Sequence, residues 1–170
     1  AHIGYYTRLF SKLVGNCAVH SFEADPENFE LLEKNTKHLA NVNIYQMAIS
    51  DRAGIIDFYH CNEKSGSHSV TAHIPVNLAT RKISVKSTDL DGILEKESAG
   101  AVDFIKMDIE GGEPAALRGM QKTLEKNRSI QVVLEFAPAW IAAGGMSPEL
   151  FLEKITSQGF KIFVITQNGL

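Results

Sequence analysis

The chain has 170 residues, 44% of them apolar and 22% charged, which is the composition of an ordinary globular protein. Its length suits a single domain over residues 1–170, and no apolar run approaches the roughly 20 residues of a membrane-spanning helix. A formal net charge of −3 offers no basic surface for nucleic acid. We therefore expect neither a nucleic acid nor a membrane as a partner, while composition leaves the oligomeric state open. The two cysteines have no metal-ligand spacing, and a reducing, cytoplasmic compartment is the default expectation.

The first third of the chain alternates between helix and strand patterns. A helix is expected after Gly4, because apolar residues recur there on one helical face. The apolar run 17–22 predicts a strand, and Asp25-Pro26 supplies an N-cap and a first helical residue for the helix that follows. Residues 42–47 return as a second strand.

Residues 54–86 interrupt this alternation. Both ends of the segment alternate between apolar and polar residues, as a β-hairpin does, and they enclose the polar stretch 62–69. The stretch is either a solvated surface loop or a mobile lid over a substrate, since long loops in compact domains are often functional. Thr88-Asp89 then begins a short helix, in the pattern of a capping box.

The second half returns to strands and helices. Buried strands are expected at 102–107, 130–136 and 160–165, and helices are expected to begin at Pro114 and at Ser147-Pro148. Strands separated by helices favour a mostly parallel sheet with right-handed crossovers and helices on both faces. We predict an α/β fold of this kind, with the 54–86 hairpin as an insertion.

The carboxyl ends of parallel strands are where ligands bind in such folds. Gly4 lies before a helix, where a residue without a side chain lets a ligand approach the backbone. Glu23 follows the first predicted strand, 19 positions after Gly4 (23 − 4), where nucleotide-binding folds place a carboxylate for ribose hydroxyls. Helix capping is the structural alternative for Glu23, but Asp25 already occupies the capping position. Met47 and Ala48 end the next strand and form either a flat wall for a purine or ordinary core.

Three carboxylates surround the Gly-Gly turn in segment 103–113. Glu113 has a structural explanation, because an anion at a helix N-terminus is stabilised by roughly 0.3–1 kcal/mol. Asp108 and Glu110 are less easily explained, since a strand-end carboxylate without a partner is costly to bury. A metal site is the rival interpretation of the cluster. No further ligand stands at a recognisable spacing, so we expect no metal.

Segment 103–113 resembles the signature of the FkbM family of O-methyltransferases, in which an apolar strand ends in Lys-x-Asp-x-Glu-Gly-x-Glu. Residues 1–7 resemble the end of that family's first cofactor motif, and residues 22–26 resemble its second strand end. Segments 87–91 and 133–135 also match in order. The resemblance implies a Rossmann-like class I methyltransferase sheet. It also implies methyl transfer from S-adenosylmethionine to a hydroxyl of a sugar or secondary metabolite.

The resemblance also implies a set of site residues. The expected cofactor contacts are Ile3, Gly4 and Tyr5 at the methionine end, Glu23 with Ala24 at the ribose, Met47 and Ala48 at the adenine, and Asp108 at the ammonium or methyl group. The expected catalytic residues are Asp108, Glu110 and His68. His68 and His73 are weaker candidates for the base, chosen because they lie in or beside the polar stretch, and a lone loop histidine is usually just solvated.

The chain departs from the family pattern at its first motif. That motif begins with Asp-x-Gly on the central strand, just before the position where this chain starts, and His2 and Ala24 stand where Asn and Pro are usual. A seventh, antiparallel strand is also missing after Leu170. We therefore expect the fold to be truncated at both ends of this chain. A nicotinamide-dependent oxidoreductase and a non-catalytic binding module stay open as alternatives, although the first loop shows no full G-x-G-x-x-G.

Overall fold

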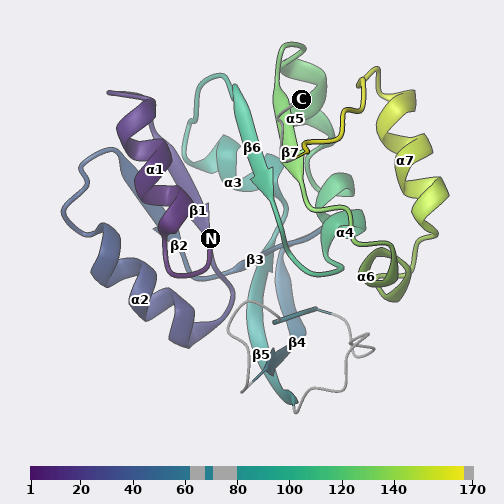
Figure 1. The fold of residues 1–170 in the computed structure, drawn as a ribbon. Helices are drawn as coiled ribbons and strands as arrows, with labels where there is room; N and C mark the ends of the chain where they lie inside the picture. The colour runs from purple at the N-terminus through teal and green to yellow at the C-terminus, as the bar shows by residue number, and fades with distance from the viewer. Residues whose placement is uncertain (62–67, 71–79, 167–170) are drawn as a thin grey trace.

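A computed structural model describes residues 1–61, 68–70 and 80–166 of the chain, and Figure 1 shows its arrangement. The described residues form a mixed α/β fold with two parallel strand pairs and a third sheet that contains a β-hairpin. Helices pack beside both parallel pairs, and the hairpin extends from the lower part of the molecule in this view. The sequence prediction of an α/β fold with mostly parallel pairing and a hairpin insertion is confirmed at this level.

The first parallel pair consists of β1 (Val19–Phe22) and β2 (Val42–Tyr45). Helices α1 (Tyr5–Leu13) and α2 (Pro26–Thr36) contact these strands. The start of α2 follows from the sequence, because the Asp25 side chain accepts hydrogen bonds from the backbone nitrogens at the second and third helical positions.

Helix α1 buries a different face from the one expected. Its apolar side chains are largely exposed, while Thr7 and Ser11 are buried. The reason is a pair of polar contacts: Thr7 Oγ1 lies 2.9 Å from Ser21 Oγ, and Ser11 Oγ donates to Asn41 Oδ1 at 2.6 Å. Polar groups that find buried partners lose little on leaving water, so this face can turn toward β1.

The hairpin follows the predicted boundaries closely. Strands β4 (Gly54–Cys61) and β5 (Thr80–Thr88) are antiparallel, with Gly54 opposite Ser87 and Phe58 opposite Ile83. The short strand β3 (Ala48–Ile49) pairs with β5 in parallel. A small core holds this sheet together, formed by the side chains of Ala48, Phe58 and Val85.

The second parallel pair consists of β6 (Phe104–Met107) and β7 (Gln131–Leu134). The main core lies between this pair and the surrounding helices. Those helices are α3 (Leu90–Lys96), α4 (Glu113–Arg118), α5 (Gln121–Lys126), α6 (Pro138–Ala143) and α7 (Pro148–Ser157). Strand β6 is less buried than its sequence indicated, since Phe104 is 41% exposed and only Met107 is buried.

Two expectations for the second half need correction, and one helix was not expected. Residues 160–165 form no strand, because they have no ladder partner among the described residues and most of their side chains are exposed. The single helix expected from Pro114 is two helices, because the helix is interrupted at Gly119. The backbone packs closely there: a Cβ added to Gly119 would lie 1.9 Å from the Ser50 carbonyl oxygen. Helix α6 was not predicted from the sequence, although Pro138 stands at its first turn.

Two further findings concern membrane-spanning helices and the two cysteines. No helix in the described part of the chain is long and apolar enough to cross a membrane. Cys17, which lies in the apolar run expected to form the first strand, is exposed because β1 begins only at Val19, whereas Cys61 is buried at the end of β4.

Candidate functional site

The turn before α1 has the tight geometry expected of its glycine. Gly4 has φ +93°, a left-handed conformation that favours glycine. A Cβ at this position would lie 3.0 Å from Leu32 Cδ1, so the turn sits directly on α2. Asn35 of α2 donates its side-chain amide to the Ile3 carbonyl at 2.7 Å, which fixes the same turn from the other side. The backbone around Gly4 is therefore held in place by α2.

Glu23 connects this turn to the end of β1. Its Oε2 accepts hydrogen bonds from the backbone nitrogens of Ala1 and His2, at 3.2 and 2.6 Å. Its Oε1 accepts from the Asp25 backbone nitrogen at 2.9 Å. The side chain is 11% exposed, so it is not fully enclosed by the protein. Asp25, and not Glu23, caps α2, as the sequence indicated.

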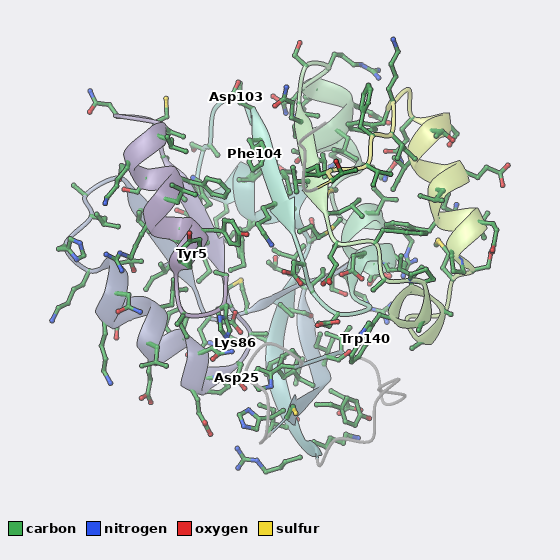
Figure 2. The ribbon with its side chains drawn as sticks, in the orientation of Figure 1. Tyr5, Asp25, Lys86, Asp103, Phe104 and Trp140 are labelled. Carbon is green, nitrogen blue, oxygen red and sulfur yellow. The ribbon has the colours of Figure 1, made fainter. Side chains whose placement is uncertain are left out.

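A buried histidine pair from the hairpin contacts Asp25. His60 Nδ1 lies 2.5 Å from Asp25 Oδ2, and His68 Nε2 lies 3.9 Å from Asp25 Oδ1. The two imidazole rings are stacked with centroids 4.5 Å apart. Burial lowers the pKa of His68, partly offset by the charge of Asp25. Burial opposes ionisation of Asp25, but hydrogen bonds and the nearby histidines lower its pKa overall. Figure 2 shows Asp25 between α2 and the hairpin.

The ligand atoms of Asp25, His60 and His68 lie within 4.8 Å of one another, close enough to hold a metal ion. The hydrogen bonding of His68 opposes this interpretation. Its Nδ1 accepts a hydrogen bond from the Cys61 backbone nitrogen at 2.9 Å, so the neutral ring carries its proton on Nε2. A metal ligand needs a lone pair on the nitrogen that faces the ion, and here that nitrogen faces Asp25 with a proton. The arrangement therefore favours a hydrogen-bonded Asp–His cluster.

The second group of carboxylates lies after β6 and β7. Lys106 Nζ donates to Asp108 Oδ2 at 3.0 Å and lies 4.7 Å from the centroid of the Tyr6 ring. Burial alone would raise the pKa of Asp108, but the hydrogen bond and charge of Lys106 lower it overall. A hydrogen bond to Asp108 raises the pKa of Glu135. The interaction between the two carboxyls therefore favours ionisation of Asp108 over ionisation of Glu135.

Glu110 has the most perturbed environment of this group. Burial, together with the charges of Glu135, Asp108 and Glu113, raises its pKa to about 7. Its backbone has φ +48°, which is uncommon for a residue with a side chain. Asp108, Glu110 and Glu135 also have ligand atoms within 4.8 Å of one another. Exposed acidic groups are common without an ion, so this proximity alone does not establish a metal site.

Two neighbours hold the turn that contains Glu110. Glu113 is buried, and its carboxylate accepts from the backbone nitrogens of Ile109 and Gly111, at 3.0 and 2.9 Å. The Ser69 hydroxyl donates to the Glu110 carbonyl oxygen at 2.5 Å. The sequence explanation of Glu113 as a structural residue at the N-terminus of α4 is consistent with these contacts.

The two groups lie near each other. Ala1 contacts Glu23 and also lies near Asp108. Glu23 in turn raises the pKa of His68, although burial lowers it overall. The next residue, Ser69, bonds the turn of Glu110. Gly4, Glu23, His68, Asp108 and Glu110 are thus brought to one region of the fold.

The remaining predicted site residues have more varied positions. Tyr5 is 71% exposed at the first position of α1. Ala48 is buried in the small core of the hairpin sheet, with Ala24 packed against it, so its side chain takes the core alternative that the sequence left open. Met47 is half-buried beside it. His73 lies outside the described residues.

Sequence reasoning missed several residues of this region. Glu135 directly follows β7, and the rule that ligands gather at strand ends could have identified it. Lys106 lies two residues before Asp108, so its charge pairing was also open to prediction. His60 and Ser69 reach their partners across 35 and 41 positions of sequence, and no local pattern indicates such contacts.

Comparison with known proteins gives consistent results. A family model described as the methyltransferase FkbM domain matches residues 1–162. The chain is 30% identical over 139 residues to the 2-O-methyltransferase NoeI of Sinorhizobium fredii, an alignment that covers 75% of this chain and 57% of that protein. It also matches the crystal structure of methyltransferase FkbM from Methylobacillus flagellatus, with a TM-score of 0.58 at 16% identity. That match covers 92% of this chain and 35% of the solved one. The chain thus spans little more than half of one relative and about a third of the other.

Proposed function

The chain belongs to the FkbM methyltransferase family, and on that premise we propose that it transfers a methyl group from S-adenosylmethionine to a hydroxyl oxygen of a sugar or secondary metabolite. The observation that supports this most is the position of Glu110. Its carboxyl has a pKa of about 7 and lies in the same region as the Gly4 turn and Glu23. The proposal includes a single Rossmann-like domain, with the two parallel pairs as parts of its sheet.

Several residues of the site suit the proposed cofactor. Glu23 is a partly exposed side chain directly after β1, and its carboxylate oxygens can accept hydrogen bonds from the hydroxyls of a ribose. Ile3, Gly4 and Tyr5 would face the methionine end, since α2 holds their backbone in a fixed turn. Met47 would contact the adenine, with Ala24 and the backbone of Ala48 behind it. When bound, S-adenosylmethionine supplies a methyl group already activated by the sulfonium.

The chemistry left to the protein is alignment and proton acceptance. Glu110 fits the role of general base, because a base works best when its pKa is near the working pH. Asp108 stays charged beside Lys106 and keeps a negative field at Glu110, which raises the proton affinity of that carboxyl. The same charge would attract the ammonium group of the cofactor. His68 is a weaker base in this arrangement, since the Cys61 backbone nitrogen occupies its Nδ1 lone pair.

One relative supports the proposed class of acceptor. NoeI is named as a 2-O-methyltransferase, and a carboxyl base suits oxygen as the nucleophile because a hydroxyl must lose its proton as the new bond forms. Asp108, Glu110 and Glu135 together offer several hydrogen-bond acceptors for a polyhydroxylated acceptor. We therefore favour a sugar or a hydroxylated metabolite.

Binding calorimetry tests the cofactor half of this proposal. The protein should bind S-adenosylhomocysteine and should not bind NAD. Glu23→Gln should weaken binding by about 1.5–3 kcal/mol, the range for a hydrogen bond to a charged group. Glu30→Gln, an exposed substitution on α2, serves as the matched control and should leave affinity unchanged.

Melting temperatures of both variants complete that experiment. Some loss of stability is expected for Glu23→Gln, because its carboxylate also bonds the backbone of His2 and Asp25. Unchanged affinity together with a lowered melting temperature would make Glu23 a purely structural residue. Binding of NAD in place of S-adenosylhomocysteine would favour an oxidoreductase.

A further inference from the structure

We propose that Ser69 is a positioning residue for Glu110, and that the adjacent pair His68–Ser69 couples the hairpin and the Glu23 side of the site to the catalytic turn. The inference rests on the proposed function insofar as Glu110 is the general base. It assigns a role to a residue that lies 41 positions from Glu110 in the sequence.

Ser69 is held on three sides. Its side chain is fully buried, at 0% exposure. Its backbone pairs with Tyr59 of β4, with the Tyr59 nitrogen donating to the Ser69 carbonyl at 2.7 Å and the Ser69 nitrogen donating back at 3.1 Å. The hydroxyl then donates to the Glu110 carbonyl oxygen at 2.5 Å. A donor fixed in this way defines where that carbonyl lies.

The Glu110 backbone needs such a restraint. A left-handed φ of +48° is strained for a residue with a side chain, so it persists only where the surroundings impose it. Glu113 restrains the nitrogens on both sides of Glu110, at Ile109 and Gly111. Ser69 restrains the carbonyl of Glu110 itself. Together these bonds keep the Glu110 carboxyl near Asp108 and Glu135.

His68 ties the same segment to the other half of the site. Its Nδ1 accepts from the Cys61 backbone nitrogen, and its Nε2 faces Asp25. Asp25 caps α2 and bonds Glu23 through its own backbone nitrogen. Two consecutive residues therefore contact the two strand ends where cofactor and base are proposed to lie. A shift of this pair changes the spacing between those ends.

The test is the pH profile of turnover in Ser69→Ala. Without the hydroxyl, the turn relaxes and the Glu110 carboxyl moves toward water, away from Asp108, Glu113 and Glu135. Its pKa then falls, so the acid limb of the profile should move to lower pH by about one unit or more. Maximal turnover should fall roughly 10- to 100-fold, as expected when a reacting group is misplaced. The KM for the acceptor should change little.

Ser87→Ala is the matched control. Ser87 lies in the same hairpin, is buried, and also donates its hydroxyl to a backbone carbonyl, that of Arg52, at 3.1 Å. It should lose stability to a similar extent but keep the wild-type acid limb. Ser69→Thr distinguishes a loss of protein stability from a misplaced Glu110 carboxyl. It retains the hydroxyl but crowds a fully buried site. It should melt earlier than wild type and still keep the acid limb near 7.

A ¹³C titration of the Glu110 carboxyl, without cofactor or acceptor, gives a readout that does not require activity. Wild type should titrate near 7, and Ser69→Ala should titrate lower. An unchanged titration and pH profile in Ser69→Ala would overturn the inference, as would equal shifts in Ser69→Ala and Ser87→Ala. A wild-type protein that transfers no methyl group defeats the proposed function instead, and the titration still decides the role of Ser69.

Discussion

At the scale of single residues, Glu110 combines two unfavourable features at one position. Its carboxyl lies among three others, which with burial raises its pKa to about 7, and its backbone is left-handed. Strain and crowded charge of this kind are concentrated at functional sites, where they are retained at the expense of stability. Nearby Glu113 shows the contrasting case, since its buried carboxylate is satisfied by two backbone nitrogens.

Glu110→Gln should therefore stabilise the protein at alkaline pH. A raised folded-state pKa means that stability is fully present below the unfolded value of 4.5 and is lost as the pH rises through about 7. Removing the charge should restore about 1 kcal/mol at pH 8, since solvent screens a partly exposed group, and almost nothing at pH 4. Urea unfolding at the two pH values measures the difference. The exposed control Glu33→Gln should show no such gain, and a loss of stability in Glu110→Gln at pH 8 would refute the account.

At the scale of elements, Asp25 joins α2 to the hairpin. One carboxylate oxygen caps the helix and the other lies 2.5 Å from His60 Nδ1 of β4. The side chain is completely buried, so its partners replace all the hydrogen bonds that water would supply. The cap of α3 differs in this respect. The Asp89 side chain accepts a hydrogen bond from the Gly92 backbone nitrogen and, among the described contacts, has no histidine partner like that of Asp25.

Asp25→Ala should consequently cost more than Asp89→Ala. Losing a cap alone costs about 1 kcal/mol, whereas Asp25→Ala also leaves the buried His60 side chain without this hydrogen-bond partner, which adds roughly 1–3 kcal/mol. Burial opposes ionisation of Asp25, but its hydrogen bonds keep its pKa below the usual value of 3.8. Its stabilising effect is thus present above that value and is lost as the pH falls below it. Chemical denaturation of both variants at pH 7 and near pH 3 measures this, and equal costs at pH 7 would contradict the proposed link.

The elements that sequence could predict are those with local causes. Asp25-Pro26 specifies the start of α2, and alternation predicts β4 and β5. The missing strand at 160–165 and the break near Gly119 depend on neighbours that lie elsewhere in the chain. The inward face of α1 was likewise decided by Ser21 and Asn41, which local apolar periodicity does not include.

At the scale of the whole molecule, the candidate site lies where the first parallel pair, the second parallel pair and the hairpin meet. Glu23 follows β1, Asp108 follows β6, and His68 and Ser69 lie between β4 and β5. In Figure 1, β1 and β2 lie to the left, β6 and β7 lie above the centre, and the hairpin of β4 and β5 lies below. The rule that ligands bind at the carboxyl ends of parallel strands predicted the first two groups. It could not predict the third, since the hairpin reaches the site through contacts of 35 and 41 positions.

The pH dependence of methyl transfer tests the central claim most directly. With saturating S-adenosylmethionine and a panel of sugar and polyol acceptors, turnover should rise with pH and reach half its maximum near 7, as the Glu110 carboxyl loses its proton. Glu110→Gln should lower turnover by about 10²–10⁴-fold and remove this limb, while affinity for S-adenosylhomocysteine stays within about tenfold. A wild-type profile that is flat between pH 5.5 and 8.5 (roughly the range in which a neutral base titrates), or full turnover by Glu110→Gln, would contradict the account.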